Sequence, residues 1–88
     1  MDSYEIQWKN SAEKDLRNID PQQIPRIVTA VESLVDNPFP RQHRKLQGAE
    51  WDYRIRVGDY RVIYQVDTET KVVIIYHVRH RREAYRRR

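Results

Sequence analysis

The 88-residue sequence contains no cysteine and only two glycines, and no apolar run in it approaches the length of a membrane span. Without cysteine the chain forms neither a disulfide framework nor a cysteine-ligated zinc site, which fits a reducing compartment. A membrane-spanning helix needs about 20 consecutive apolar residues. The N-terminal segment MDSYEIQWKN has no basic head followed by an apolar stretch. We therefore expect one soluble, cytoplasmic domain over residues 1–88, with no membrane partner.

Several familiar catalytic patterns are also missing. The sequence has no glycine-rich phosphate loop, no serine, histidine and acid at a recognisable spacing, and no carboxylates paired for acid–base chemistry. The histidines His43, His77 and His80 do not have the spacing of a zinc site, and acids do not cluster with them. The sequence therefore predicts neither a metal site nor another cofactor.

The clearest pattern that is present is strand alternation over residues 51–66, WDYRIRVGDYRVIYQV. Apolar or aromatic residues alternate with polar ones on both sides of Gly58-Asp59, which is typical of two half-buried strands joined by a tight turn. With that turn, Arg56 faces Arg61. Like charges directly opposite each other destabilise a sheet, so this register indicates a surface that binds an anion. The alternative is a solvated face on which the arginines splay apart.

Before this hairpin, the sequence predicts a short strand and two helices. Residues 4–8 alternate as a strand does, and Asn10 is expected to cap a helix that ends at Asn18-Ile19. Asp20-Pro21 is expected to begin a second helix, whose apolar residues recur at helical spacing on one face. The segment 37–40, Asn-Pro-Phe-Pro, ends that helix.

After the hairpin, the pattern predicts a turn and then a last strand over residues 71–79, apolar on both faces and therefore interior. A loop over residues 68–70 places Arg61 opposite His77. The charged residues expected on one face are Arg54, Arg56, Arg61, His77 and Arg79. The residues expected on the opposite, apolar face, which both helices would cover, are Tyr53, Ile55, Val57, Tyr60, Val62, Tyr64, Val72, Ile74, Tyr76 and Val78.

These elements predict an α+β fold, with two N-terminal helices packed on a small, mainly antiparallel, twisted sheet. Residues 81–87 are expected to form a short helix or turn that brings Tyr85 back to the basic end of the sheet. Lys45-Leu46 is expected in a loop or small strand before the hairpin.

The formal net charge is +4, and the positive charge is concentrated at the C-terminal end. Such an asymmetric basic domain is typical of nucleic-acid binding, although an arginine-rich tail that only aids solubility is the alternative for the last residues. The residues that we expect to contact RNA beside the charged face are Arg44, Lys45, His77, His80 and Arg81.

A basic sheet face with tyrosine and histidine beside it suits RNA cleavage without a metal. In that reaction the ribose 2′-hydroxyl attacks the adjacent phosphate, which requires a proton acceptor, charge stabilisation and a donor for the leaving 5′-oxygen. Arginine supplies the charge stabilisation because its planar fork binds phosphate through two hydrogen bonds.

At this point the sequence resembles the RelE branch of the RelE/ParE toxin superfamily. The resemblance covers essentially the whole chain, and its most specific parts are Gly58-x-Tyr60-Arg61-x-x-Tyr64 and the ending Arg79…Arg81…Tyr85. It implies a RelE-like fold and a toxin of a type II toxin–antitoxin system, which cleaves mRNA in the A site of the 70S ribosome and is inhibited by a cognate antitoxin.

The resemblance also implies a catalytic set: Arg54, Arg56, Arg61, Arg79 and Tyr85. The family often has lysine at the first two of these positions, and arginine, unlike lysine, does not become a neutral base. We therefore expect Arg54 and Arg56 to bind the scissile phosphate, Arg61 and Arg79 to stabilise developing charge, and Tyr85 to take or relay the 2′-hydroxyl proton. His77 or His80 is the candidate acid.

Two other functions remain open from the sequence. A ParE-type protein would poison DNA gyrase instead of cutting RNA, although such proteins generally lack this set of arginines and tyrosine. A non-catalytic RNA-binding module, or a toxin that has lost its activity, is the second alternative, because arginine replaces lysine at two positions.

Overall fold

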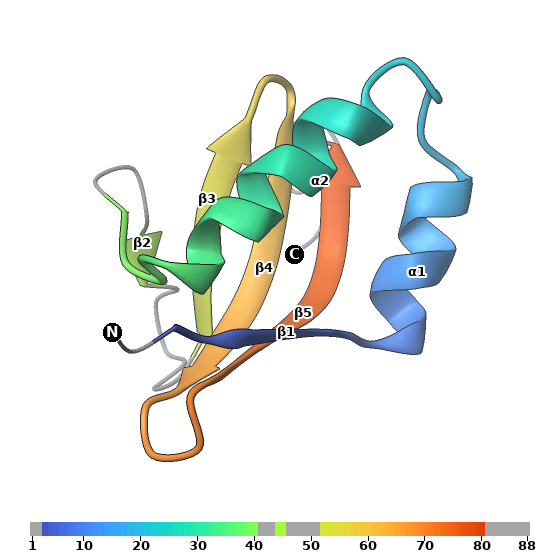
Figure 1. Ribbon diagram of the computed structural model, residues 1–88. Coiled ribbons are helices and arrows are strands. Elements are labelled where there is room, and N and C mark those ends of the chain that lie inside the picture. The colour runs from blue at the N-terminus through green and yellow to red at the C-terminus, as the bar shows by residue number, and fades with distance from the viewer. Residues whose placement is uncertain (1–2, 41–43, 46–51, 81–88) are drawn as a thin grey trace.

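The computed structural model describes residues 3–40, 44–45 and 52–80, and within these ranges the chain is α+β, as expected (Figure 1). The elements in chain order are β1 (Glu5–Trp8), α1 (Asn10–Arg17), α2 (Ile24–Glu32), a 3₁₀ turn η1 (Ser33–Val35), β2 (Arg44–Lys45), β3 (Asp52–Val57), β4 (Tyr60–Asp67) and β5 (Val72–His80). Neither helix in these ranges is long and apolar enough to cross a membrane.

The strands form one sheet in the order β1-β5-β4-β3-β2. It is mainly antiparallel, as predicted, because β1 alone runs parallel to its neighbour, β5. The β3–β4 hairpin has the predicted register, with Arg56 opposite Arg61. Gly58 in its turn has φ +61°, a left-handed conformation that glycine adopts without steric cost.

The predicted β4–β5 register is wrong, for two structural reasons. The turn contains four residues, 68–71, because Lys71 adopts φ +61° and pairing begins with Asp67 opposite Val72. The ladder then shifts between Ile63 and Tyr64, which lie opposite residues 77 and 75 and leave Tyr76 as an extra residue in β5. Arg61 therefore faces Arg79, not His77.

This change of register also corrects the predicted apolar face. A slip of one residue moves side chains to the other face of a sheet. The buried residues of β5 are consequently Val73, Ile75 and Val78, whereas Val72, Ile74 and Tyr76 are only partly buried. The β3 and β4 residues of the predicted core that are buried are Ile55, Val62 and Tyr64.

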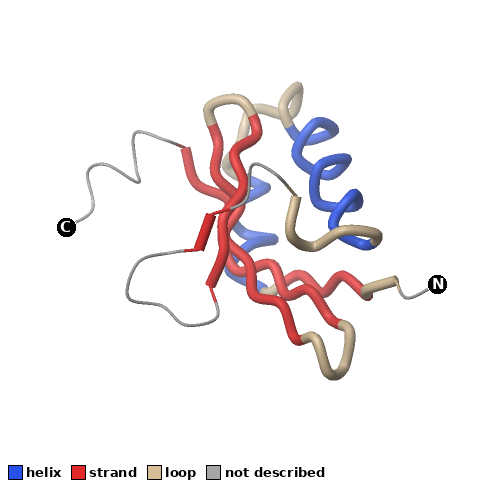
Figure 2. The backbone as a smooth tube through the Cα atoms, turned by 90° about the vertical axis from the view of Figure 1, so that its left-hand side faces the viewer, coloured by secondary structure: helices blue, strands red, loops and turns tan. Residues whose placement is uncertain are grey.

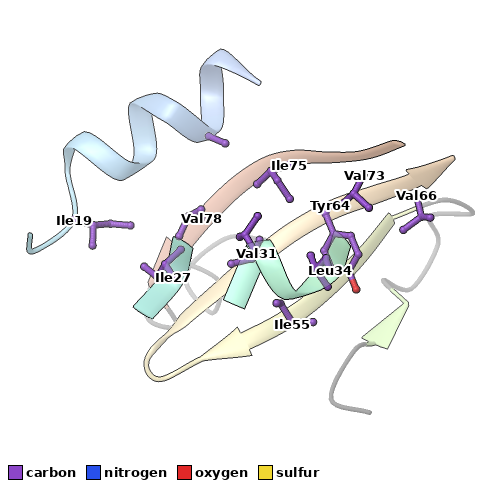
Figure 3. Close-up of a cluster of buried hydrophobic side chains, with 12 residues drawn as sticks. Ile19, Ile27, Val31, Leu34, Ile55, Tyr64, Val66, Val73, Ile75 and Val78 are labelled. Carbon is purple, nitrogen blue, oxygen red and sulfur yellow. The ribbon is translucent and has the colours of Figure 1, made fainter. Parts of the chain in front are cut away.

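The two helices occupy different positions, although both were expected on one face. Helix α2 crosses the apolar face of the sheet, while α1 lies alongside the part of β5 that extends beyond its pairing with β1 (Figures 1 and 2). From α2 and the following turn, Ile27, Val31 and Leu34 are completely buried against the strands (Figure 3). Ala12 and Ile19 extend the same core towards α1.

The helices do not begin where the capping patterns indicate: α1 begins one residue earlier, and α2 begins three residues later. Asn10 is the first residue of α1, and Lys9 before it makes no side-chain capping bond. Asp20 accepts a hydrogen bond from the backbone N–H of Gln22 and so closes a turn before α2, which begins at Ile24. Proline at the second helical position is compatible with this start because its missing N–H would have no partner there.

Candidate nucleic-acid interface

Three guanidiniums from adjacent strands form a row across the sheet, which we call the arginine row: Arg56, Arg61 and Arg79. Arg56 of β3 lies opposite Arg61 of β4, and Arg61 lies opposite Arg79 of β5. Side chains that are directly opposite in a sheet have Cβ atoms about 5 Å apart and point to the same face. The structure therefore brings together three of the predicted catalytic residues.

The next row contains the other two residues of the predicted charged face. Arg54 lies opposite Ile63, and Ile63 lies opposite His77. These rows alternate with Ile55, Val62 and Val78, which are buried under α2, so the charged side chains point away from that helix. The expected set of four arginines and His77 thus shares one face, although Arg61 pairs with a different residue of β5.

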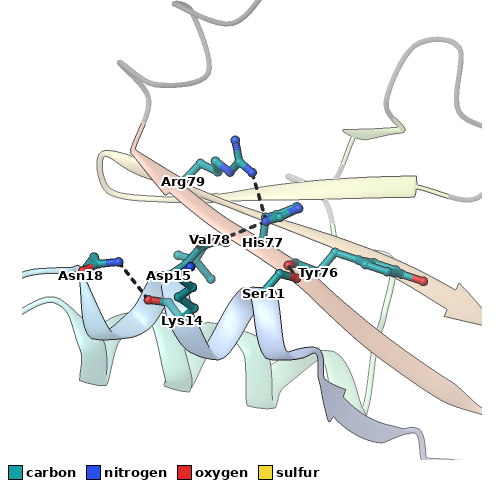
Figure 4. Close-up of polar contacts among 8 residues, drawn as sticks. All are labelled: Ser11, Lys14, Asp15, Asn18, Tyr76, His77, Val78 and Arg79. Carbon is teal, nitrogen blue, oxygen red and sulfur yellow. Dashed lines mark hydrogen bonds and ion pairs between the residues drawn. The ribbon is translucent and has the colours of Figure 1, made fainter.

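His77 has two polar neighbours at its Nδ1 atom (Figure 4). Oδ2 of Asp15 lies 3.2 Å from Nδ1, and Nη2 of Arg79 lies 3.2 Å from the same nitrogen. The Asp15 carboxylate also accepts a hydrogen bond of 3.0 Å from the backbone N–H of Val78. Side chain and backbone of β5 are therefore both tied to α1.

Sequence reasoning missed Asp15, although a signal for it exists. Ser11 and Asp15 are four residues apart and lie on the same side of α1. Ser11 Oγ donates a 2.6 Å hydrogen bond to the carbonyl of Tyr76, so the two side chains together satisfy the edge of β5 beyond its pairing with β1. A polar pair at this spacing on an otherwise amphipathic helix was the available indication.

Sequence reasoning also missed Arg26. The guanidinium of this α2 residue lies about 3.7 Å from the position that a Cβ would occupy at Gly58. The hairpin turn is bordered on its other side by Arg56, whose Nε donates to the Gly58 carbonyl at 3.1 Å. The positive surface therefore continues from the arginine row around the end of the hairpin.

His80 does not join the arginine row. It lies opposite Tyr60, and the two rings meet edge to face with centroids 5.2 Å apart. Because His80 is two residues beyond the buried Val78, it belongs to the opposite side of the sheet from His77. The expectation that His80 lies beside the charged face is therefore wrong.

The remaining predicted residues divide into two groups. Arg44 and Lys45 form the edge strand β2, in which Arg44 pairs with Arg54 and Lys45 with Tyr53. Leu46, Arg81 and Tyr85 lie outside the described residues, as does the predicted C-terminal helix or turn. In the part of the chain that is described, no group of three or more histidine, aspartate or glutamate side chains could hold a metal ion.

Tyr64, the last residue of the motif Gly58-x-Tyr60-Arg61-x-x-Tyr64, is a core residue. Its ring is completely buried, and its hydroxyl donates a 2.8 Å hydrogen bond to the carbonyl of Pro38. Burial raises the pKa of the Tyr64 phenol well above its ordinary value, and the neighbouring Tyr53 adds to this shift. The motif thus combines a functional arginine candidate with a tyrosine that anchors the loop after α2.

Comparison with known proteins shows the family to which the chain belongs. Residues 6–85 match the family model of the ParE toxin of the type II toxin–antitoxin system parDE. A relative from Methanocaldococcus jannaschii, a putative toxin RelE1, is 32% identical over 76 residues, which cover 83% of this chain and 84% of the relative. The chain belongs to the RelE/ParE superfamily of toxins of type II toxin–antitoxin systems.

Solved structures place this toxin in the RelE-like part of the superfamily. The archaeal RelE–RelB complex from Pyrococcus horikoshii contains a chain with 31% identity and a TM-score of 0.79, and the match covers 90% of this toxin and 96% of that chain. The toxin–antitoxin complex RelBE2 from Mycobacterium tuberculosis contains one with 25% identity and a TM-score of 0.77, covering 89% and 98%. The RelE-like fold expected from the sequence is confirmed.

Proposed function

We propose that this toxin is an endoribonuclease that cleaves mRNA in the A site of the 70S ribosome, in the cytoplasm, without a metal ion. In the reaction, the ribose 2′-hydroxyl loses its proton and its oxygen attacks the adjacent phosphorus. The P–O5′ bond breaks, the leaving oxygen gains a proton, and the products carry a 2′,3′-cyclic phosphate and a 5′-hydroxyl. Each side chain assigned below binds charge or moves one of these protons.

The observation that carries the proposal is the arginine row. Three guanidiniums on neighbouring strands lie on the face of the sheet opposite α2, where they suit the negative charge that is spread over the oxygens of a five-coordinate phosphate. We assign Arg54 and Arg56 to binding the scissile phosphate and Arg61 and Arg79 to stabilising the transition state. His77 is the candidate acid, because it lies beside Arg79 on the same face.

Two further roles are assigned to residues outside the described part of the chain, and these assignments rest on the sequence resemblance alone. We assign Tyr85 to the 2′-hydroxyl proton, either as acceptor or as relay, and Arg81 to RNA contact. Arg44 and Lys45 are assigned to RNA contact at the edge of the sheet, where Arg44 pairs with Arg54. The relatives' complexes contain RelB antitoxins, and by extension this toxin is inhibited by a cognate antitoxin.

Purified toxin incubated with programmed ribosomes, followed by primer extension, tests the activity. The expected result is a stop within the A-site codon that Arg61→Ala strongly weakens and Arg17→Ala preserves. Arg17 is the matched control because it removes the same charge from an exposed position on α1. Intact message with wild-type toxin bound to the ribosome would reject the nuclease.

The name of the matching family model favours a second function, inhibition of DNA gyrase, because that model describes ParE toxins. A supercoiling assay with purified gyrase distinguishes the two. Loss of supercoiling at toxin concentrations that leave the message intact would establish the gyrase function instead. Absence of both activities, with growth unaffected on overexpression, would indicate a non-catalytic RNA-binding protein.

A further inference from the structure

The Nδ1 atom of His77 has two neighbours that require opposite protonation states of this nitrogen. Nδ1 lies 3.2 Å from the Asp15 carboxylate and 3.2 Å from the Arg79 guanidinium (Figure 4). A carboxylate only accepts hydrogen bonds and a guanidinium only donates them. Nδ1 must therefore carry a proton to bond Asp15 and a lone pair to bond Arg79. The two contacts exclude each other, and the position of one proton decides between them.

Asp15 is the fixed neighbour of the two. Its Oδ2 also accepts the Val78 N–H at 3.0 Å, and its side chain is only 26% exposed. Without a proton on Nδ1, two acceptors would face each other at 3.2 Å. Arg79, by contrast, is a long side chain on a partly exposed face and can turn to another acceptor. The arrangement therefore favours a proton on Nδ1, with Arg79 as the group that moves.

We propose that Asp15 is a positioning residue: it holds a proton on Nδ1 of His77, so that Nε2 exchanges a proton with the RNA and Arg79 is released to a phosphate. This inference rests on the proposed function, in which His77 is the acid. In that step the Nε2–H bond of the imidazolium breaks as the P–O5′ bond breaks, and the proton joins the 5′-oxygen. His77 is left neutral, with its remaining proton on Nδ1 and bonded to Asp15.

Of the charged groups described around His77, Asp15 is the one that can accept a hydrogen bond from Nδ1. Arg79 faces the ring from its own strand, and Arg54 lies in the same row of the sheet with Ile63 between them. A guanidinium only donates hydrogen bonds, so neither arginine can hold the Nδ1 proton. The Asp15 carboxylate, from α1, contacts the ring and can accept it. Removing this carboxylate should therefore let Nδ1 accept from Arg79, with the proton of the neutral ring on Nε2.

Ser11 provides a matched control for a merely structural role. Ser11 and Asp15 each satisfy one backbone group at the same edge of β5, the carbonyl of Tyr76 and the N–H of Val78. Asp15 also touches His77 through its carboxylate. If the edge bonds alone matter, Ser11→Ala and Asp15→Asn should have similar effects. Asn retains an oxygen that can accept the Val78 N–H, so Asp15→Asn is the milder change to the backbone.

The first measurement needs no enzymatic activity. Long-range ¹H–¹⁵N NMR spectra of the labelled toxin at alkaline pH report which nitrogen of a neutral imidazole is protonated, and His77→Gln assigns the signal. The expected result is protonated Nδ1 in wild type and in Ser11→Ala, and a shift towards protonated Nε2 in Asp15→Asn. Protonated Nε2 in wild type would overturn the proposal, as would an unchanged signal in Asp15→Asn. If Asp15→Asn does not fold, the wild-type spectrum alone decides.

The second measurement uses the single-turnover rate on programmed ribosomes. Asp15→Asn should lower the rate by about tenfold, with ribosome binding unchanged. This is less than the roughly 10²-fold low end of general acid–base effects, because His77 itself remains. Ser11→Ala should keep the wild-type rate. Equal rates in both variants would contradict the proposal. If the wild-type toxin cleaves no message, the proposed nuclease activity is rejected. The NMR measurement then still tests whether Asp15 holds the proton on Nδ1 of His77.

Discussion

The two faces of the sheet are built from alternate residues of the same strands, yet they serve opposite purposes. Under α2, Ile55, Val62 and Val78 are almost completely buried. One residue along each strand, Arg56, Arg61 and Arg79 are exposed or partly exposed. Folding energy therefore comes from one face, while the other keeps like charges together at a cost to stability. Because this cost brings no gain in stability, the charged face is explained by a function rather than by folding.

The largest effect should come from breaking the apolar face. Ile75 is fully buried in β5, so Ile75→Ala should lower the free energy of unfolding by about 2–5 kcal/mol. Urea denaturation followed by circular dichroism measures it. Ile74→Ala, at a partly buried position on the opposite side of the same strand, is the control and should cost much less. Equal losses would mean that the two faces do not differ as described.

Breaking the charged face should affect activity and leave stability largely intact. Arg61→Ala should reduce the cleavage rate on programmed ribosomes by about 10²–10³-fold, as expected for one preorganised donor to a developing anion. Its free energy of unfolding should fall far less than that of Ile75→Ala, because Arg61 lies on the face opposite the core and a like-charge neighbour of Arg56 and Arg79 is removed. A large loss of stability in this variant would assign the arginine to folding.

These two faces also show how far the sequence alone could go. Alternation around Gly58-Asp59 predicted the hairpin register, and the arginines were grouped on the right face. The predictions failed where the strand departs from regular geometry. The left-handed conformation of Lys71 adds a fourth residue to a turn for which the sequence indicated three. The extra residue at Tyr76 could not be predicted from the alternation, because most residues on both faces of β5 are apolar. Asp15 was missed because its partner lies 62 residues away along the chain.

Tyr64 provides a sharper test of the apolar face at alkaline pH. Its raised pKa in the folded state means that the folded protein keeps the phenol neutral while the unfolded chain ionises it near pH 10. Its contribution to stability is therefore complete below about pH 10 and is lost as the pH rises further. Tyr64→Phe should lose about 1 kcal/mol at neutral pH with the bond to Pro38. The Tyr64→Phe variant should also lack the fall in stability that ionisation of Tyr64 causes above about pH 10. Unfolding midpoints measured from pH 8 to 11 test this.

The smallest expected effect concerns salt. Each phosphate contact with single-stranded RNA contributes about 0.7 to the slope of log affinity against log salt concentration. Arg56→Ala should therefore reduce the slope for a short RNA by about 0.7, whereas Arg17→Ala, on the exposed side of α1, should leave it unchanged. Fluorescence anisotropy at several salt concentrations measures both. Identical slopes for wild type and Arg56→Ala would remove Arg56 from the RNA contact.

The most direct test of the central claim is photo-crosslinking of the toxin to a message carrying 4-thiouridine in the A-site codon of a programmed ribosome. Peptides joined to the RNA are then identified by mass spectrometry. The account predicts crosslinks to the outward-facing residues of β3, β4 and β5, around Arg56, Arg61 and Arg79. Crosslinks that instead map to the exposed surface of α2, with none on these strands, would contradict it.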